Sequence, residues 1–279
     1  MNKIRCGAAL AIGVALAGGG VSVWASQAPP ADPPTAPAVA SGEQGSGPAP
    51  ESSNCKKTFS SGAGLTRFVW CFSSDGNIVK LEHAAGLEHV RIGSFLEGFC
   101  ISSNSATHGE SKGDNGNVGL NPPTYPSPTK VVHTTIDGVW RIEQTFAQTA
   151  ATRTVRVTMK VTNTSGTAQA NVFLTRWIDA DMSNTTGGDV WVSGLRSVSV
   201  SEPGSSRLEL MAGNTAYATV NTMIFAGALP TLNQFCFDPV ADGVNTAGAS
   251  DRSMAILQQL ETVSPGASKT AIFEYRVSN

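Results

Sequence analysis

The sequence lacks an excess of basic residues. Its 19 Lys and Arg residues face 21 Asp and Glu residues, a formal charge of −2, and without Lys3 and Arg5 that charge becomes −4. The basic residues are scattered and form no stripe, which argues against a nucleic-acid-binding domain. Beyond the first 25 residues no apolar run is long enough to span a membrane as a helix.

Several catalytic motifs are also missing. The chain contains no H-E-x-x-H zinc motif, no Walker-type phosphate loop and no dinucleotide-binding glycine pattern. These absences make an enzyme less expected without excluding one. The motifs therefore assign no catalytic residue.

The N-terminus has the order of a secretory signal peptide. A short basic segment, residues 1–5, precedes an uncharged, Ala- and Gly-rich apolar run from Gly7 to Val23. Small or apolar residues at Val23-Trp-Ala25 place the expected cleavage after Ala25, with Ser26 to Ala28 as the second choice. The alternative is an uncleaved membrane anchor, for which the apolar run is short and diluted by glycine. We therefore expect residues 1–25 to be a signal peptide, and the mature protein to be secreted or periplasmic.

The next segment predicts a spacer. Residues 26–53 are mostly Pro, Ala, Gly and Ser with a few acids, a composition that cannot bury enough apolar surface to offset the entropy of ordering. It is either a tether or a passive leader. The remaining residues, 54–279, fit one large domain better than two small ones.

Four cysteines remain after the expected cleavage. They are Cys55, Cys71, Cys100 and Cys236, an even number in an exported chain, which predicts two disulfides. Three pairings are possible. We favour Cys55–Cys71 with Cys100–Cys236, because the first closes a local loop and the second would join distant strands. The spacing is not that of a zinc site.

Apolar and polar residues alternate with a period of two, the pattern of half-buried strands. Between Val155 and Val161 every odd position is apolar, and residues 270–277 repeat the pattern. Asp75-Gly76 and Asp137-Gly138 are dipeptides that favour tight hairpin turns. Residues 163–166 link two further strands, 153–162 and 170–178.

A dozen or more such strands are too many for one flat sheet. The sequence therefore predicts an all-β fold, a large antiparallel two-sheet sandwich. Residues 103–129 and 238–252 lack strand character and are expected to be long loops, each of which could frame a site if ordered.

The order of these features resembles known proteins. Residues 76–83 form a hairpin strand, residues 161–174 a strand–turn–strand unit, and residues 264–276 a final turn and strand. This order is similar to that of uncharacterised secreted bacterial β-sandwich proteins and, more distantly, of the galactose-mutarotase-like supersandwich. The resemblance implies a supersandwich-like fold and a carbohydrate ligand. No histidine here aligns with the mutarotase-like catalytic motifs, so those roles do not carry over.

An acidic segment follows an apolar strand and could bind a metal. Closely spaced carboxylates followed by Asn and Gly can bring together the oxygen ligands of Ca²⁺. The candidate ligands are Asp179, Asp181, Asn184 and Asp189. The segment lacks the final Glu and the helices of an EF-hand, so a solvated acidic turn is the other interpretation.

Two further groups could carry chemistry. Trp177 and Trp191 flank the acidic segment and either pack in the core or stack on a sugar ring. Glycoside hydrolysis needs two carboxylates on a cleft. The nominees are Glu97, Glu143, Asp179 and Asp181, of which Glu97 and Glu143 are also candidate ligand-binding residues.

A short repeat places histidines near acids. Leu81-Glu-His83 and Leu87-Glu-His89 lie on either side of a turn, so neighbouring strands could gather two His and two Glu for a metal or an acid–base pair. A polar hairpin face would have the same sequence. His108 and His133 have no recognisable companion.

Two functional hypotheses remain. The first is an exported, non-catalytic binding or structural module, whose partner would be polysaccharide or cell-envelope glycan. The second is a carbohydrate-active enzyme, a hydrolase, lyase or epimerase, that uses the carboxylates named above. No cofactor is expected other than the possible Ca²⁺.

Overall fold

The alternating sequence folds into eighteen antiparallel β-strands in the part of the chain that a computed structural model describes. The described residues are 55–84, 86–90, 97–103, 106–112, 116–149, 152–180, 182, 190–202, 206–213, 220–226 and 252–278. They contain no α-helix; a 3₁₀ turn spans Gly64–Thr66. No helix within these ranges is long and apolar enough to cross a membrane.

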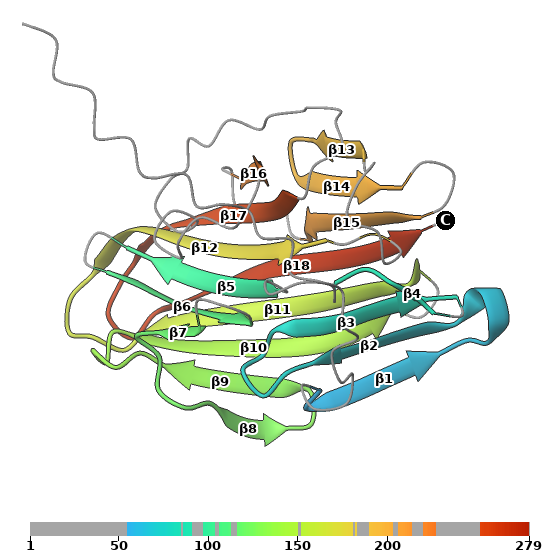
Figure 1. Cartoon of the computed structure of the whole chain (residues 1–279). Coiled ribbons are helices and arrows are strands. Elements are labelled where there is room, and N and C mark those ends of the chain that lie inside the picture. The colour runs from blue at the N-terminus through green and yellow to red at the C-terminus, as the bar shows by residue number, and fades with distance from the viewer. Residues whose placement is uncertain are drawn as a thin grey trace, which may run out of the picture. The chain divides into compact units, whose positions relative to one another are not determined.

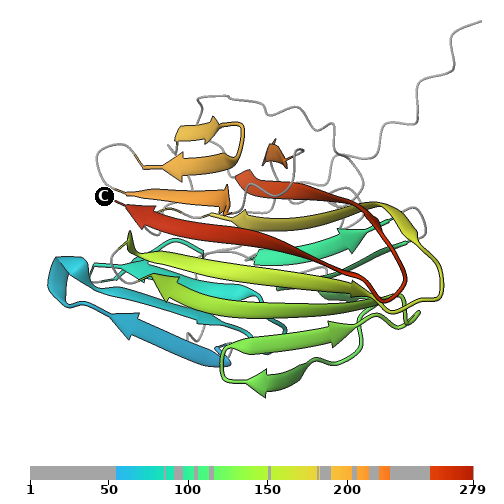
Figure 2. The same ribbon diagram turned by 180° about the vertical axis from the view of Figure 1, so that it is seen from behind.

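The largest sheet has eight strands (Figures 1 and 2). In order across the sheet they are β13 (Val190–Ser193), β14 (Ser197–Ser201), β15 (Arg207–Ala212), β18 (Ser268–Ser278), β11 (Thr154–Asn163), β10 (Trp140–Thr149), β9 (Lys130–Thr134) and β8 (Thr124–Ser127).

The second sheet has six strands and the third has four. The six are β16 (Val220–Ala226), β17 (Arg252–Val263), β12 (Gln169–Asp179), β5 (Glu97–Ser102), β6 (Thr107–Lys112) and β7 (Gly116–Val118). The four are β1 (Lys57–Ser61), β2 (Phe68–Phe72), β3 (Ile78–His83) and β4 (Leu87–Glu88).

Both smaller sheets pack on the same face of the eight-stranded sheet (Figure 1). Phe72 of β2 stacks on Phe146 of β10, with ring centroids 4.3 Å apart. Arg176 of β12 reaches Gln144, which shares the inward face of β10 with Phe146. Fully buried aliphatic and aromatic side chains fill the space between the layers. The expected all-β, two-sheet sandwich is confirmed, with a third, smaller sheet added to one layer.

Two of the connections that carry the chain between the layers are adjacent. One joins β11 to β12 and the other joins β17 to β18, so each begins in one sheet and ends in the other. Buried Asn163 fastens them together, since its side-chain amide donates to the carbonyl oxygens of Thr167 at 2.7 Å and Val263 at 2.9 Å. The 163–166 turn therefore joins two sheets and does not form a hairpin.

The predicted Asp-Gly turns form where expected. Asp75-Gly76 separates β2 from its antiparallel partner β3, and Asp137-Gly138 separates β9 from β10. The expected loop at 103–129 is wrong in part, because it contains the short strands β6, β7 and β8. Their backbones pair with β5 and β9 without apolar alternation in the side chains. Residues 238–251 lie outside the described residues.

Candidate functional site

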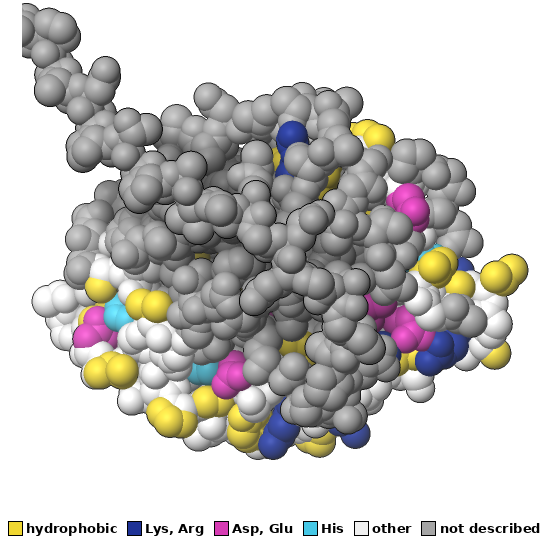
Figure 3. Space-filling model, viewed as in Figure 1, with side chains coloured by type: hydrophobic (Ala, Val, Ile, Leu, Met, Phe, Trp, Pro, Cys, Tyr) yellow, Lys and Arg dark blue, Asp and Glu magenta, His cyan; other side chains and the backbone are white. Residues whose placement is uncertain are grey.

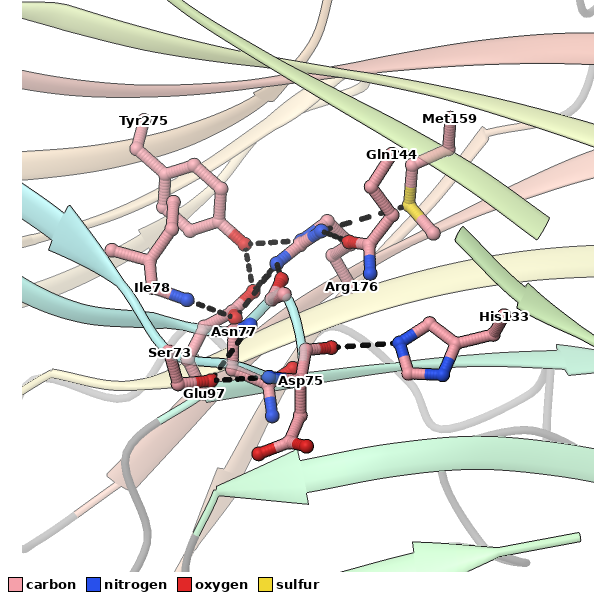
Figure 4. A network of polar contacts seen from close by, with 11 residues as sticks. Ser73, Asp75, Asn77, Ile78, Glu97, His133, Gln144, Met159, Arg176 and Tyr275 are labelled. Atoms are coloured by element: carbon pink, nitrogen blue, oxygen red, sulfur yellow. Dashed lines mark hydrogen bonds and ion pairs between the residues drawn. The ribbon is translucent and has the colours of Figure 1, made fainter. Parts of the chain in front are cut away.

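A cluster of buried polar side chains occupies the space between the sheets (Figure 4). We call Glu97, Gln144, Arg176 and Tyr275 the polar core cluster. They come from β5, β10, β12 and β18, and none of them is exposed to solvent. Each alternates along its strand with residues that point to the opposite face, so strand geometry alone turns these four side chains inward.

Arg176 is the centre of the cluster. Its Nε and Nη2 donate to the two carboxylate oxygens of Glu97, at 2.8 and 2.7 Å, in the fork geometry that strengthens such pairs. Its Nη1 donates to Gln144 Oε1 at 2.6 Å. Its Nε also lies 2.9 Å from the Tyr275 hydroxyl. A buried guanidinium is thereby supplied with acceptors from both layers.

Glu97 is held from three directions. Besides Arg176, the Tyr275 hydroxyl and the Ile78 backbone N–H donate to its carboxylate. Burial raises the pKa of Glu97, and the Arg176 charge and these hydrogen bonds oppose that rise. Burial lowers the pKa of Arg176, but the Glu97 charge, the Tyr275 hydroxyl and the hydrogen bonds to both together outweigh it and raise the pKa overall. Burial also raises the pKa of Tyr275 well above its ordinary value, so its hydroxyl stays a neutral donor.

The β2–β3 turn completes the cluster. Its backbone carbonyls face inward, where Gly76 O lies 3.3 Å from Arg176 Nη2 and Asp75 O lies 2.9 Å from His133 Nε2. The cluster therefore joins all three sheets. Because its side chains are sealed from solvent, its chemistry in this arrangement is to neutralise and fix charge in the core, and a sugar cannot reach Glu97 without rearrangement.

The other carboxylates nominated for catalysis lie elsewhere. Glu143 points away from the core and forms ion pairs with Lys130 and Arg141. Asp179 ends β12 on the face opposite to Arg176, where its Oδ1 accepts from Ser253 Oγ at 3.3 Å. Asp181 lies outside the described residues. Glu97, Glu143 and Asp179 thus do not meet on one cleft.

The tryptophans expected near a sugar are both 1% exposed. Trp191 belongs to the main apolar core, and Trp177 lies on the face of β12 that carries Asp179. An aromatic side chain that the sequence did not indicate, Tyr125, is 40% exposed, and Lys56 Nζ lies 4.2 Å from its ring centroid. Sugar binding by Trp177 and Trp191 stays a prediction that would require these side chains to move.

The histidine repeat does bring two rings together. His83 Nδ1 and His89 Nε2 are 2.6 Å apart, and both rings are buried. Burial, helped by His83, lowers the pKa of His89 to about 3. The repeat's acids are engaged elsewhere: Glu82 forms ion pairs with Arg67 and Lys80, and Glu88 Oε1 accepts three backbone N–H groups.

His108 has a companion that the sequence did not reveal. Its Nε2 lies 2.9 Å from Asp137 Oδ2 in the β9–β10 turn.

The residues that follow His108, 109–113, match the G-x-S-x-G pattern of serine hydrolases. Their first four residues lie inside strand β6, whereas a nucleophile elbow needs a sharp strand-to-helix turn. The pattern match therefore does not indicate a hydrolase.

The metal and disulfide predictions are resolved only in part. Asp179 is described, but Asp181, Asn184 and Asp189 lie outside the described residues. Within the described ranges, no three His, Cys, Asp or Glu side chains form a metal-binding group. Cys55 and Cys71 form the expected disulfide. Cys100 is also disulfide-bonded, and Cys236 lies outside the described residues, so the second pairing stays a prediction.

Comparison with known proteins shows which solved structures have a similar fold. No protein-family model and no curated protein sequence matches the chain. A bacterial glucoamylase complexed with acarbose is similar over 80% of this chain with a TM-score of 0.52 and 8% identity, and the match covers 32% of the glucoamylase. A GalM/aldose epimerase homologue from C. elegans matches 80% of this chain and 99% of its own, with a TM-score of 0.46 and 8% identity. The chain thus spans about a third of the glucoamylase, and the likeness establishes a shared sandwich fold.

Proposed function

We propose that residues 54–279 form an exported, non-catalytic β-sandwich module that binds carbohydrate. The observation that carries the proposal is the sandwich fold shared with part of a glucoamylase. Since fold and function are separable, this observation supports a class of ligand and no reaction.

The placement of the carboxylates supports a binding role over a catalytic one. A glycosidase needs two carboxyl groups about 5 to 10 Å apart on an accessible cleft. Of the described nominees, Glu97 is neutralised by Arg176 in the core, while Glu143 and Asp179 face different surfaces. The Cys55–Cys71 disulfide supports an oxidising compartment, as expected for a secreted or periplasmic protein.

A glycan array with the mature chain tests the binding role. We expect binding to at least one polysaccharide, with no release of reducing ends or unsaturated products on prolonged incubation. Absence of binding to every glycan would remove the carbohydrate part of the proposal. Product release would instead favour the second candidate, a carbohydrate-active enzyme of the hydrolase or lyase class.

The calcium site remains part of the proposal. Asp179 has a carboxylate at the end of β12, and three further oxygen-bearing side chains follow within ten residues. If Ca²⁺ binds there, the melting temperature should rise with added CaCl₂ and fall with chelator, and Asp179→Asn should reduce the difference. Identical melting curves in both conditions would count against the site.

A further inference from the structure

The outer face of the eight-stranded sheet has an unusual balance of charge. Residues that alternate with the core side chains along β9, β10, β11, β18 and β15 make up this face, seen from its own side in Figure 2. Six are basic: Lys130, Arg141, Arg156, Lys160, Arg207 and Arg276. Three are acidic: Glu143, Glu209 and Glu274. The rest of the chain then has 13 basic residues against 18 acidic ones.

The charges form three neighbouring groups. Glu143 pairs with Lys130 and Arg141, and Lys160 lies opposite it on β11. Burial raises the pKa of Glu143, but these three cations lower it by more, so that the pKa lies below its ordinary value and the carboxylate is ionised. The group of three cations and one carboxylate therefore keeps a net positive charge.

The other two groups continue across the sheet. Glu274 pairs with Arg156 at 2.6 Å, and Glu209 lies 3.2 Å from Arg207 and 3.8 Å from Arg276. The arginine side chains of the face are 40–48% exposed, so their unused N–H donors can reach a ligand. With strands about 4.8 Å apart, the groups extend roughly 19 Å from β9 to β15.

Hydroxyl groups lie between the charges. Strands β11 and β18 place Thr158, Thr162, Ser268 and Thr270 on the same face, and Thr162 Oγ1 bonds Ser268 Oγ at 2.8 Å. Hydroxyls both donate and accept, which matches the hydroxyls of a sugar. In Figure 3, which shows the opposite side of the molecule, acidic and basic side chains of described residues lie next to each other toward one edge.

We propose that this outer face binds an acidic polysaccharide built of uronic acids. A guanidinium fork fits a planar sugar carboxylate, the extra cations supply complementary charge, and the hydroxyl rows suit the remaining sugar groups. The inference rests on the proposed carbohydrate-binding function and adds to it the ligand class and the surface.

The test compares three polymers on the mature chain by isothermal titration calorimetry: polygalacturonate, neutral dextran and dextran sulfate. We expect binding to polygalacturonate that weakens as salt rises, and none to dextran. The double variant Lys160→Glu with Arg276→Glu should weaken polygalacturonate binding about tenfold or more.

A matched control carries the same change of charge elsewhere. Lys56→Glu with Lys57→Glu alters two exposed lysines at the start of the four-stranded sheet and should bind like the wild type. The double variant Lys160→Gln with Arg276→Gln removes the same two positive charges without adding negative charge, and it should also weaken polygalacturonate binding. A thermal melt confirms that each variant is folded.

The possible failures are distinguishable. If both double reversals weaken binding equally, the outer face is not the site. If dextran binds as tightly as polygalacturonate, or if only dextran sulfate binds, the uronic-acid ligand is wrong. If neutral glycans bind and the charge variants change nothing, carbohydrate binding stands and this inference falls. If none of the three polymers binds, this inference falls, and if no glycan on the array binds either, carbohydrate binding falls with it.

Discussion

Arg176 is the residue on which the polar core cluster depends. It is fully buried, and its removal would leave the Glu97 carboxylate without a charged partner in the core. We expect Arg176→Ala to lower the free energy of unfolding by about 3–5 kcal/mol. Arg176→Lys should lower the free energy of unfolding by less, because lysine keeps the positive charge but cannot form the two parallel hydrogen bonds to the Glu97 carboxylate. Urea denaturation of the purified variants measures both values.

The control for that prediction is an exposed ion pair. Arg156 also pairs with a glutamate, Glu274, but its side chain is 48% exposed. Arg156→Ala should therefore cost about 1 kcal/mol or less. Equal losses at Arg156 and Arg176 would show that the buried cluster has no special role in stability.

His89 should make stability depend on pH. Its pKa in the folded protein is about 3, lowered by burial and by His83, against about 6.5 in the unfolded chain. The unfolded state therefore binds the proton first, and the contribution of His89 is complete above about pH 6.5 and is lost as pH falls toward 3.

The measurement is a urea denaturation series from pH 4 to pH 8 for wild type and His89→Gln. The slope should be steeper in the wild type, by up to about 1.4 kcal/mol per pH unit. Burial raises the pKa of neighbouring Glu88, which has the opposite pH dependence, but Glu88 is present in both proteins and cancels in the difference. Parallel pH profiles would contradict the prediction.

At the scale of residues, the sequence indicated which side chains could matter more often than it indicated which side chains they contact. The repeat at His83 and His89 predicted a meeting that the structure contains. Arg176 went unnoticed, although a lone arginine inside the apolar stretch from Val172 to Ile178 was a signal that could have revealed it. Its partners Glu97 and Tyr275 lie 79 and 99 residues away in sequence, a separation that no local pattern bridges.

At the scale of elements, the β2–β3 turn is more constrained than its sequence suggests. Gly76 has a φ of +82°, and a Cβ there would lie 2.3 Å from Gln144 Nε2. Gly76→Ala should therefore combine backbone strain of about 1–3 kcal/mol with displacement of a side chain that binds Arg176.

Gly138 offers a matched comparison. It has a φ of +72° in the other Asp-Gly turn, but a Cβ there would meet no atom within 4 Å. Gly138→Ala should show the backbone cost alone, so Gly76→Ala should be the more destabilising of the two in urea denaturation. A smaller loss at Gly76 would mean that the turn can move away from Gln144.

The same elements show what pattern reasoning can reach. Strands such as β11 and β18 were predictable because one face of each is buried and the other faces solvent, so apolar and polar residues alternate in the sequence. Strands β6 to β8 were not, since they pair through the backbone with Gly, Ser and Pro in their sequence. The assignment of β11 and β12 to different sheets also lies beyond local sequence, because the turn at Asn163 suits a crossover as well as a hairpin.

At the scale of the whole molecule, the sheets are held by different means. The two large sheets are joined by several passages of the chain, among them β11 to β12 and β17 to β18, and by the polar core cluster. The four-stranded sheet comes first in the chain and docks through aromatic packing such as Trp70 and Phe72 against Phe146. The Cys55–Cys71 disulfide ties the start of this sheet to β2. Its contribution should therefore decide how firmly the smallest sheet stays in place.

The double substitution Cys55→Ala with Cys71→Ala tests that contribution. The disulfide closes a loop across a sequence separation of 16 residues, so its loss should lower the free energy of unfolding by about 3 kcal/mol in the chain-entropy account. Urea denaturation of the oxidised proteins gives the difference. Reductant should weaken the wild type at least as much, because Cys100 is disulfide-bonded as well. If the variant matches the oxidised wild type, the four-stranded sheet is held by packing alone, and the disulfide gives no stability reason for folding in an oxidising compartment.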